Sequence, residues 1–314
     1  PRCSYVLRRG PARAEARGLP APGEQLEDPP HTPDSMPLPD LRVQQALLIA
    51  DARGVRVAAQ SDDFDAPEAE RLAVLYGRPP AGVACPLAHF AQPFGARHVA
   101  VVQVADRHDG LALRFLVLAA DLYRHLGDPF AVADRFPPDW TAIGPLPTLE
   151  WPPAPLPPRT AADLQAVLKA CDPATEEMAL LLGSTQVLVD GGRVLVARRE
   201  PAERFVRALW QLLPDKARAE LWPASFAFAA DLPFDAAALP ELPADETGVR
   251  HTEDGLKGYP PGNYEHRLQA AVEAGDDREL AALLARRTGN DTIRLGLTII
   301  AGAVVLAAVF KFIL

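Results

Sequence analysis

The side chains in this sequence that could perform acid–base chemistry are four histidines and two aspartates within a span of 46 residues. They are His89, His98, His108, His125, Asp128 and Asp134. If the fold brings them together, an imidazole beside a carboxylate could serve as a general base in a hydrolase, or bind a ligand in a sensor. The alternative is that they are ordinary loop and strand-end residues, since several stand beside Asp, Arg or Gly at expected turns.

Two further groups of side chains could form binding surfaces. An aromatic group could line a groove for a ligand or partner, or pack in the core beneath a long loop. A basic group could bind an acidic partner or lipid head groups, or form a solvated face in which Glu200 and Glu203 alternate with the arginines. The aromatic group is Tyr123, Phe130, Phe136, Trp140 and Trp151, and the basic group is Arg193, Arg198, Arg199, Arg204 and Arg207.

The sequence contains none of the catalytic or cofactor motifs sought in it. GxxxxGK[ST], GxGxxG, HExxH and GxSxG are missing, and the segment LLGSTQ at 181–186 has neither the lysine nor the spacing of a phosphate-binding loop. The histidines show no metal-ligand spacing, and Cys3, Cys85 and Cys171 form no CxxC pair. Ser184 is expected to be a turn serine. We therefore assign no catalytic, cofactor-binding or metal-binding residues, and expect no cofactor.

Composition limits the classes of partner. The chain has 314 residues, enough for one large or two small domains. A net charge of −9 and a pI near 5.3 argue against general nucleic-acid binding, which needs clustered basic charge. The 33 prolines concentrate in segments typical of linkers and loop ends. We expect a protein partner and no nucleic acid.

The apolar pattern predicts an α+β fold of antiparallel hairpins with short packing helices. Helices are expected to begin near Pro67, Thr160, Pro173 and Pro201. The segment 121–140, dense in aromatic and turn residues, predicts a long ordered loop. Gly-containing turns between β-forming runs predict hairpins over 43–59, 98–120 and 184–199, and alternation predicts a further strand over 224–233.

Shifts in composition along the chain predict six segments. Residues 1–35 are expected to be a disordered or misassigned N-terminal extension, because Met36 is the first methionine. The remaining segments are a first α+β unit with a Pro-rich end over 36–158, a second α+β unit over 159–230, a Pro/Gly/acidic linker over 231–263, short juxtamembrane helices over 264–290 and a transmembrane tail over 291–314.

The end of the chain predicts a membrane anchor. Leu295 to Leu314 reads LGLTIIAGAVVLAAVFKFIL, and Lys311 is its only charge. A helix of twenty such residues is about 30 Å long, the thickness of the hydrocarbon core of a bilayer. Arg286, Arg287 and Arg294 precede it, which favours a cytoplasmic soluble part. We expect a single-pass, tail-anchored protein of the inner membrane, bound through Leu295–Leu314.

Two stretches resemble a known family. These are VQQALLIADARGVRVAAQSDDF, with its Gln-Gln-Ala strand, Gly-containing hairpin and Ser61, and QLLPDKARAELWPASFAFA over 211–229, with Leu213-Pro214 before a Phe-rich strand. They resemble the N-terminal domain of bacterial GTPase-associated proteins, over about residues 42–230. Members of that family are non-enzymatic adaptors encoded beside GTPase or other effector modules in conflict systems. The resemblance implies a GTPase or effector module as partner, and no catalytic residues.

These observations lead to two functional hypotheses. The first is a tail-anchored, non-catalytic adaptor or scaffold that presents a protein-binding α+β domain at the cytoplasmic face of a membrane. The alternative is a membrane-tethered hydrolase or ligand sensor that uses the His/Asp-rich region 89–134. Convergence of His98, His108, His125 and Asp134 within hydrogen-bond reach would favour the enzyme.

Overall fold

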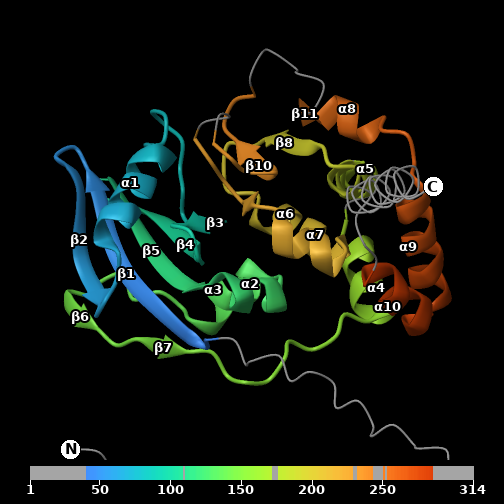
Figure 1. Cartoon of the computed structure of the whole chain (residues 1–314). Helices are drawn as coiled ribbons and strands as arrows, with labels where there is room; N and C mark the ends of the chain where they lie inside the picture. The colour runs from blue at the N-terminus through green and yellow to red at the C-terminus, as the bar shows by residue number, and fades with distance from the viewer. Residues whose placement is uncertain are drawn as a thin grey trace, which may run out of the picture. The chain divides into compact units, whose positions relative to one another are not determined.

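The computed structural model describes residues 40–108, 110–171, 176–228, 232–242, 250–251 and 253–285. Within these ranges the chain forms eleven strands and ten helices (Figure 1). The expected N-terminal extension, 1–35, and the expected transmembrane tail, 291–314, lie outside the described residues.

The strands of the described ranges belong to one mixed sheet, in the spatial order β11-β8-β10-β9-β3-β4-β5-β1-β2-β6, and β7 pairs with β1. They are β1 (Arg42–Asp51), β2 (Gly54–Ser61), β3 (Ala88–Phe94), β4 (His98–Arg107), β5 (Gly110–Ala119), β6 (Gly144–Leu146), β7 (Leu149–Glu150), β8 (Arg193–Ala197), β9 (Pro223–Ala224), β10 (Ala236–Leu239) and β11 (Arg250–His251). Neighbours from β9 to β2 are antiparallel, whereas β11, β8, β10 and β9 are parallel to one another.

Short helices connect and cover these strands. They are α1 (Ala66–Tyr76), α2 (Ala120–Leu126), α3 (Pro129–Arg135), α4 (Ala161–Lys169), α5 (Glu177–Val189), α6 (Glu203–Leu212), α7 (Asp215–Glu220), α8 (Glu253–Lys257), α9 (Asn263–Ala274) and α10 (Asp277–Leu284). The start signals read from the sequence are confirmed at α1, which has Pro67 in its first turn, and at α4, where Thr160 and Asp163 form a capping box.

The expected fold class, α+β with antiparallel hairpins, is wrong because the sheet is mixed. The chain leaves β8, passes through α6 and α7, and returns to β9 and β10 in the same direction, and such crossovers give parallel strands. The antiparallel and parallel parts meet where Phe90 pairs with Ala224. Strands from the two expected units, 36–158 and 159–230, therefore share one sheet.

Two of the three predicted hairpins are confirmed. β1 and β2 pair antiparallel and close with Asp51 opposite Gly54, and β4 and β5 close with Arg107 opposite Gly110. Gly54 has φ +126°, a value that L side chains rarely adopt. The turn signals in the sequence therefore placed both hairpins correctly.

The third predicted hairpin, over 184–199, is wrong. Its first half is the end of α5, in which the residues from Leu180 to Leu188 are all buried. A helix buried on all sides has no polar stripe, so its apolar run has no helical period that would distinguish it from a strand. Asp190 ends this helix, and the chain then enters β8.

Three other segments also differ from their expected structure. The expected loop over 121–140 contains α3 and most of α2. Of the expected strand over 224–233, only Ala224, the second residue of β9, lies in a strand among the described residues. The expected linker over 231–263 contains β10, whose four residues are buried beside β8. The run Ala236–Leu239 is too short and too rich in alanine to signal a strand by itself.

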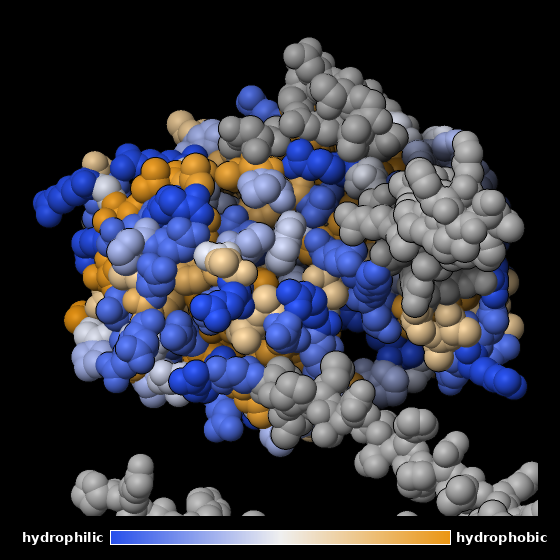
Figure 2. All heavy atoms as spheres, viewed as in Figure 1, coloured by the Kyte–Doolittle hydropathy of each residue, from blue (hydrophilic) through white to orange (hydrophobic). Residues whose placement is uncertain are grey.

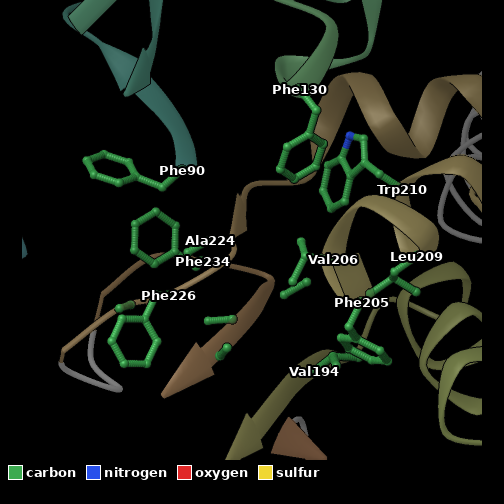
Figure 3. Close-up of a cluster of buried hydrophobic side chains, with 14 of the residues drawn as sticks. Phe90, Phe130, Val194, Phe205, Val206, Leu209, Trp210, Ala224, Phe226 and Phe234 are labelled. Atoms are coloured by element: carbon green, nitrogen blue, oxygen red, sulfur yellow. The ribbon is translucent and has the colours of Figure 1, made fainter. Parts of the chain in front are cut away.

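Both faces of the antiparallel part are covered, so its strands are apolar along most of their length. In β1, Ala46, Leu48 and Ala50 face the largest core cluster, whereas Leu47 and Ile49 face the opposite side. The largest cluster continues under the parallel part, where Figure 3 shows aromatic side chains from β3, α3 and α6 gathered together. Strands buried on both faces read as near-continuous hydrophobic runs.

No helix among the described residues is long and apolar enough to cross a membrane. This finding contradicts the expected fold with its one transmembrane helix, and with it the tail-anchored, inner-membrane assignment. The segment on which the expectation was based, 291–314, lies outside the part of the chain that the structure describes.

Gly183 allows α5 to pack closely on α8. A Cβ at this position would lie 2.1 Å from the carbonyl oxygen of Leu256, so one backbone must move. We expect Gly183→Ala to lower the free energy of unfolding by about 1–3 kcal/mol in urea denaturation followed by circular dichroism. The control is Gly255→Ala on α8. An added Cβ there would lie within 4 Å of no atom beyond its chain neighbours and its own helix backbone, so alanine should be neutral or stabilising. Equal effects would contradict this close approach.

Candidate functional site

The predicted group of four histidines is dispersed in the structure. His98 begins β4 and His108 follows its last residue, so the ten residues of that strand hold them about 33 Å apart. His98 and His125 are both exposed. These three histidines and Asp134 therefore do not form one acid–base site.

His89 differs from the others because it is buried beside an acid. It lies on β3 with 4% of its surface exposed, and its Nδ1 is 2.9 Å from Oε2 of Glu203, the first residue of α6. This contact is an ion-pair distance, and neither of the two atoms has a hydrogen-bond partner among the described residues. The pair connects the antiparallel part of the sheet to a helix of the parallel part.

Ser225 is buried beside this pair and bonds to the backbone of His89. Its Oγ accepts a hydrogen bond of 2.8 Å from the backbone N–H of His89, and its own N–H donates to the His89 carbonyl, also at 2.8 Å. A catalytic serine gives its proton to an imidazole and faces the substrate. The hydroxyl of Ser225 instead accepts a hydrogen bond from the backbone, and Ser225 is 0% exposed.

Arg207, also on α6, extends the group to the surface. Its Nη1 and Nη2 donate to the two carboxylate oxygens of Asp134, at 2.7 and 2.9 Å, and its Nε donates to Glu203. Its guanidinium carbon lies 4.8 Å from the centre of the Phe130 ring. We call the five polar residues His89, Asp134, Glu203, Arg207 and Ser225 the His89 cluster.

The electrostatics of the His89 cluster keep its acid ionised. Burial alone would raise the pKa of Glu203, but hydrogen bonds and charges from His89 and Arg207 outweigh it and hold the pKa below its ordinary value of 4.5. A carboxylate that is ionised near neutral pH is a poor proton donor there. The arrangement is that of a structural connection between elements.

Asp128 has a separate structural role. Its Oδ1 accepts from the N–H groups of Phe130 and Ala131, which caps the N-terminus of α3. Its Oδ2 accepts from Arg218, at 2.6 Å. Both carboxylate oxygens are therefore bonded within the protein.

The predicted aromatic group is divided among three core clusters. Phe130 belongs to the largest one, Trp140 packs against the smallest, and the other three members belong to or pack against the cluster beneath α2. Tyr123 stacks on Trp222 with ring centres 5.6 Å apart, and Phe136 meets Trp151 edge-on at 6.1 Å. These contacts support core packing rather than a shared groove.

Most of the predicted basic group is bonded within the protein. Arg193 donates to the carbonyls of Leu232 and Phe234, Arg198 pairs with Glu253, and Arg204 donates to the carbonyl of Ala170. Arg207 belongs to the His89 cluster. The four therefore do not form a free basic surface.

A second buried polar group was not predicted from the sequence. Arg114 on β5 is 7% exposed, and its guanidinium donates to the side-chain oxygens of Gln45 and Gln103 and to the carbonyl of Phe136. Burial lowers the pKa of Arg114. An arginine inside the apolar run LALRFLVLAA was the available signal, since such a charge needs buried acceptors. Its donors are bonded to amide and carbonyl oxygens on three segments.

Two further kinds of chemistry were sought. Among the described residues, no group of three or more His, Cys, Asp or Glu side chains could hold a metal ion. Cys85 is 0% exposed, and burial raises the pKa of its thiol to about 12, so it stays protonated near neutral pH.

The described residues form a mixed α/β fold, in which buried polar groups connect elements that are far apart in the sequence. No family model matches the sequence, and no curated protein is significantly similar to it.

Proposed function

We propose that this protein is a non-catalytic adaptor that binds a protein partner through the outer surface of α1. One observation carries the proposal. Val74 and Leu75, adjacent on α1, expose 65% and 52% of their surfaces although both are large and apolar. Figure 2 shows hydrophobic surface in the region where Figure 1 draws this helix. Apolar side chains exposed next to one another are typical of protein-binding sites.

A shallow hollow of about 200 Å³ lies beside these side chains. It is lined by the α1 residues Leu72, Leu75 and Tyr76, together with Pro93 and Leu232. Arg71 and Gln92 are also in its lining and give it polar groups. A hydrophobic centre with a polar border is the usual composition of a protein interface.

The chemistry of the His89 cluster favours an adaptor over an enzyme. Its imidazole and its serine hydroxyl are buried and bonded to neighbouring groups, so a substrate would have to displace structural contacts. The resemblance to GTPase-associated adaptors suggests a GTPase or an effector module as the partner. We retain that class of partner as part of the proposal.

A capture experiment tests the α1 surface. The full chain and a Val74→Asp/Leu75→Asp variant are each immobilised and used to capture proteins from a lysate of the organism that encodes the unchanged chain. We expect one stoichiometric protein with the unchanged chain and at least tenfold less with the variant, because burying each side chain is worth about 1–2 kcal/mol. Both positions are exposed, so the variant should fold.

Met178→Asp is the matched control, since Met178 is apolar and 42% exposed on α5. It should capture the same protein as the unchanged chain. Capture that is equal for all three chains, or no stoichiometric protein with the unchanged chain, would contradict the proposal.

A further inference from the structure

The outer edge of β2 is only partly covered. Its inner edge pairs with β1 from Gly54 to Gln60. On its outer side β6 pairs only with Ala59, Gln60 and Ser61, and no other described strand pairs there. The edge from Gly54 to Ala58 is therefore open, and Figure 1 shows β2 at the rim of the sheet.

The hairpin register identifies the backbone groups that are available on this edge. Asp51 and Gly54 close a two-residue turn, so they form a hydrogen-bonded pair, and hydrogen-bonded pairs alternate along the strands. Gly54 and Arg56 thus bond to β1, whereas the N–H and C=O groups of Val55 and Val57 point outward. The side chains of these two valines pack against the main core cluster, which holds the edge in place.

Arginines gather at the hairpin end of this edge. Asp51 Oδ1 accepts a hydrogen bond from the backbone N–H of Arg53, and its Oδ2 lies 4.0 Å from Nε of Arg56. The Asp51 carbonyl accepts a hydrogen bond from the guanidinium of Arg78. Arg107 lines the same hollow of about 510 Å³ as Asp51 and Arg56. We call Arg53, Arg56, Arg78 and Arg107 the basic tip. It is locally positive in a chain whose net charge is −9.

The other end of β2 is acidic and the flank is apolar. Asp62 and Asp63 line a hollow of about 610 Å³ together with residues 57–61 of β2 and the start of β6. Ile143, immediately before β6, is 86% exposed and lines the hollow at the basic tip. The two ends of the edge therefore differ, since the hairpin end has positive charge and an apolar side chain and the other end has negative charge.

We propose that the open edge Gly54–Ala58 binds an extended, acidic segment of a protein by strand addition, with its acidic residues at the basic tip. Only an extended backbone can match the alternate outward groups of Val55 and Val57. Five residues span about 17 Å, a usual length for such a segment. This surface is distinct from the exposed residues of α1, so the proposal does not depend on the function of that helix.

A second copy of the chain fits this edge poorly. Two β2 edges that share the outward groups of Val55 and Val57 would pair antiparallel about Arg56. That register places Arg56 opposite its own copy, and like charges directly opposite are destabilising. An acidic partner places a carboxylate there instead.

The test uses two fluorescein-labelled ten-residue peptides, one of alternating valine and glutamate and one of alternating valine and lysine, titrated with the full chain in fluorescence anisotropy. We expect the glutamate peptide to bind at least tenfold more tightly than the lysine peptide, and to lose affinity in 0.5 M salt. Arg56→Glu should weaken binding of the glutamate peptide at least tenfold. The matched control is Arg124→Glu on α2, since the Arg56 and Arg124 side chains are 64% and 60% exposed.

Val57→Pro tests the strand pairing separately, because it removes an outward N–H that β1 does not use. Val57→Pro should weaken binding of the glutamate peptide at least tenfold. If this variant fails to fold, the Arg56→Glu variant still tests the proposal. Equal binding of both peptides, no binding, or unchanged binding by Arg56→Glu would overturn the proposal. Self-association of the free chain that Val57→Pro abolishes would also overturn it, in favour of a second copy. Val74→Asp/Leu75→Asp should leave peptide binding unchanged, which separates the two surfaces.

Discussion

Trp210→Ala is expected to lower the free energy of unfolding by about 3–5 kcal/mol. Trp210 lies on α6 and is 0% exposed. Its Nε1 donates to the carbonyl of Gly127, at 3.2 Å, and its ring meets Phe130 edge-on at 6.4 Å (Figure 3). Alanine would leave a cavity between α6 and α3 and an unpaired buried carbonyl.

The measurement is urea denaturation followed by circular dichroism, because the substitution removes a fluorophore. Trp140→Ala is the matched control, since Trp140 is only partly buried, against the smallest cluster. Trp210→Phe keeps an aromatic ring and loses the indole hydrogen bond, so its effect should lie between the other two. If Trp210→Ala costs no more than Trp140→Ala, α6 does not pack as described.

Glu203→Ala is expected to lower the free energy of unfolding by about 2–4 kcal/mol at pH 7. The substitution removes the ion pair of buried His89 with Glu203 and one of the two ion pairs of Arg207. The ion pair of Arg207 with Asp134 remains. The Glu203 side chain is 26% exposed, so the effect should fall below that of a fully buried pair. Glu203→Gln keeps the shape and removes only the charge, and it should cost less.

The effect of Glu203 depends on pH with a defined sign. Its pKa in the folded protein lies below the ordinary value of 4.5, so the stability it contributes is fully present above pH 4.5 and is lost as the pH falls through the folded pKa. The unchanged chain and Glu203→Gln should therefore converge in stability as the pH falls below 4.5. Denaturation curves at a series of pH values between 3 and 7 measure this.

Glu200→Gln is the control for both comparisons, since Glu200 is exposed three residues away. It should change stability by less than about 0.5 kcal/mol at any pH. A difference between Glu203→Gln and the unchanged chain that stays constant down to pH 3 would contradict the depressed pKa.

Local signals predicted the antiparallel part of the fold well. Gly54 and Gly110 stand at the two turns between β-forming runs, and both hairpins have the expected residues. The same reasoning failed for α5, where Gly191 and Gly192 follow a helix. An apolar run signals burial, and its surroundings decide whether it is buried as a strand or as a helix.

Charge patterns alone did not predict how the polar residues would be bonded. His89 was in the predicted group, but its partners Glu203 and Ser225 were not, and the hydrogen bond between His89 and Ser225 joins residues 136 positions apart. Such a partner depends on the order of strands in the sheet. The edge of β2 is likewise open only because β6 pairs with no more than the last three residues of that strand.

The sequence by itself determined the elements whose causes are local, such as the Gly-containing turns of the two hairpins and the helix starts at Pro67 and Thr160. These depend on the backbone preferences and side-chain spacing of a few neighbouring residues. Only the tertiary structure decided the mixed sheet, the bonding of the His89 cluster and the exposure of α1 and β2. Each of these depends on contacts between residues far apart in the chain, whose pairing no local pattern specifies.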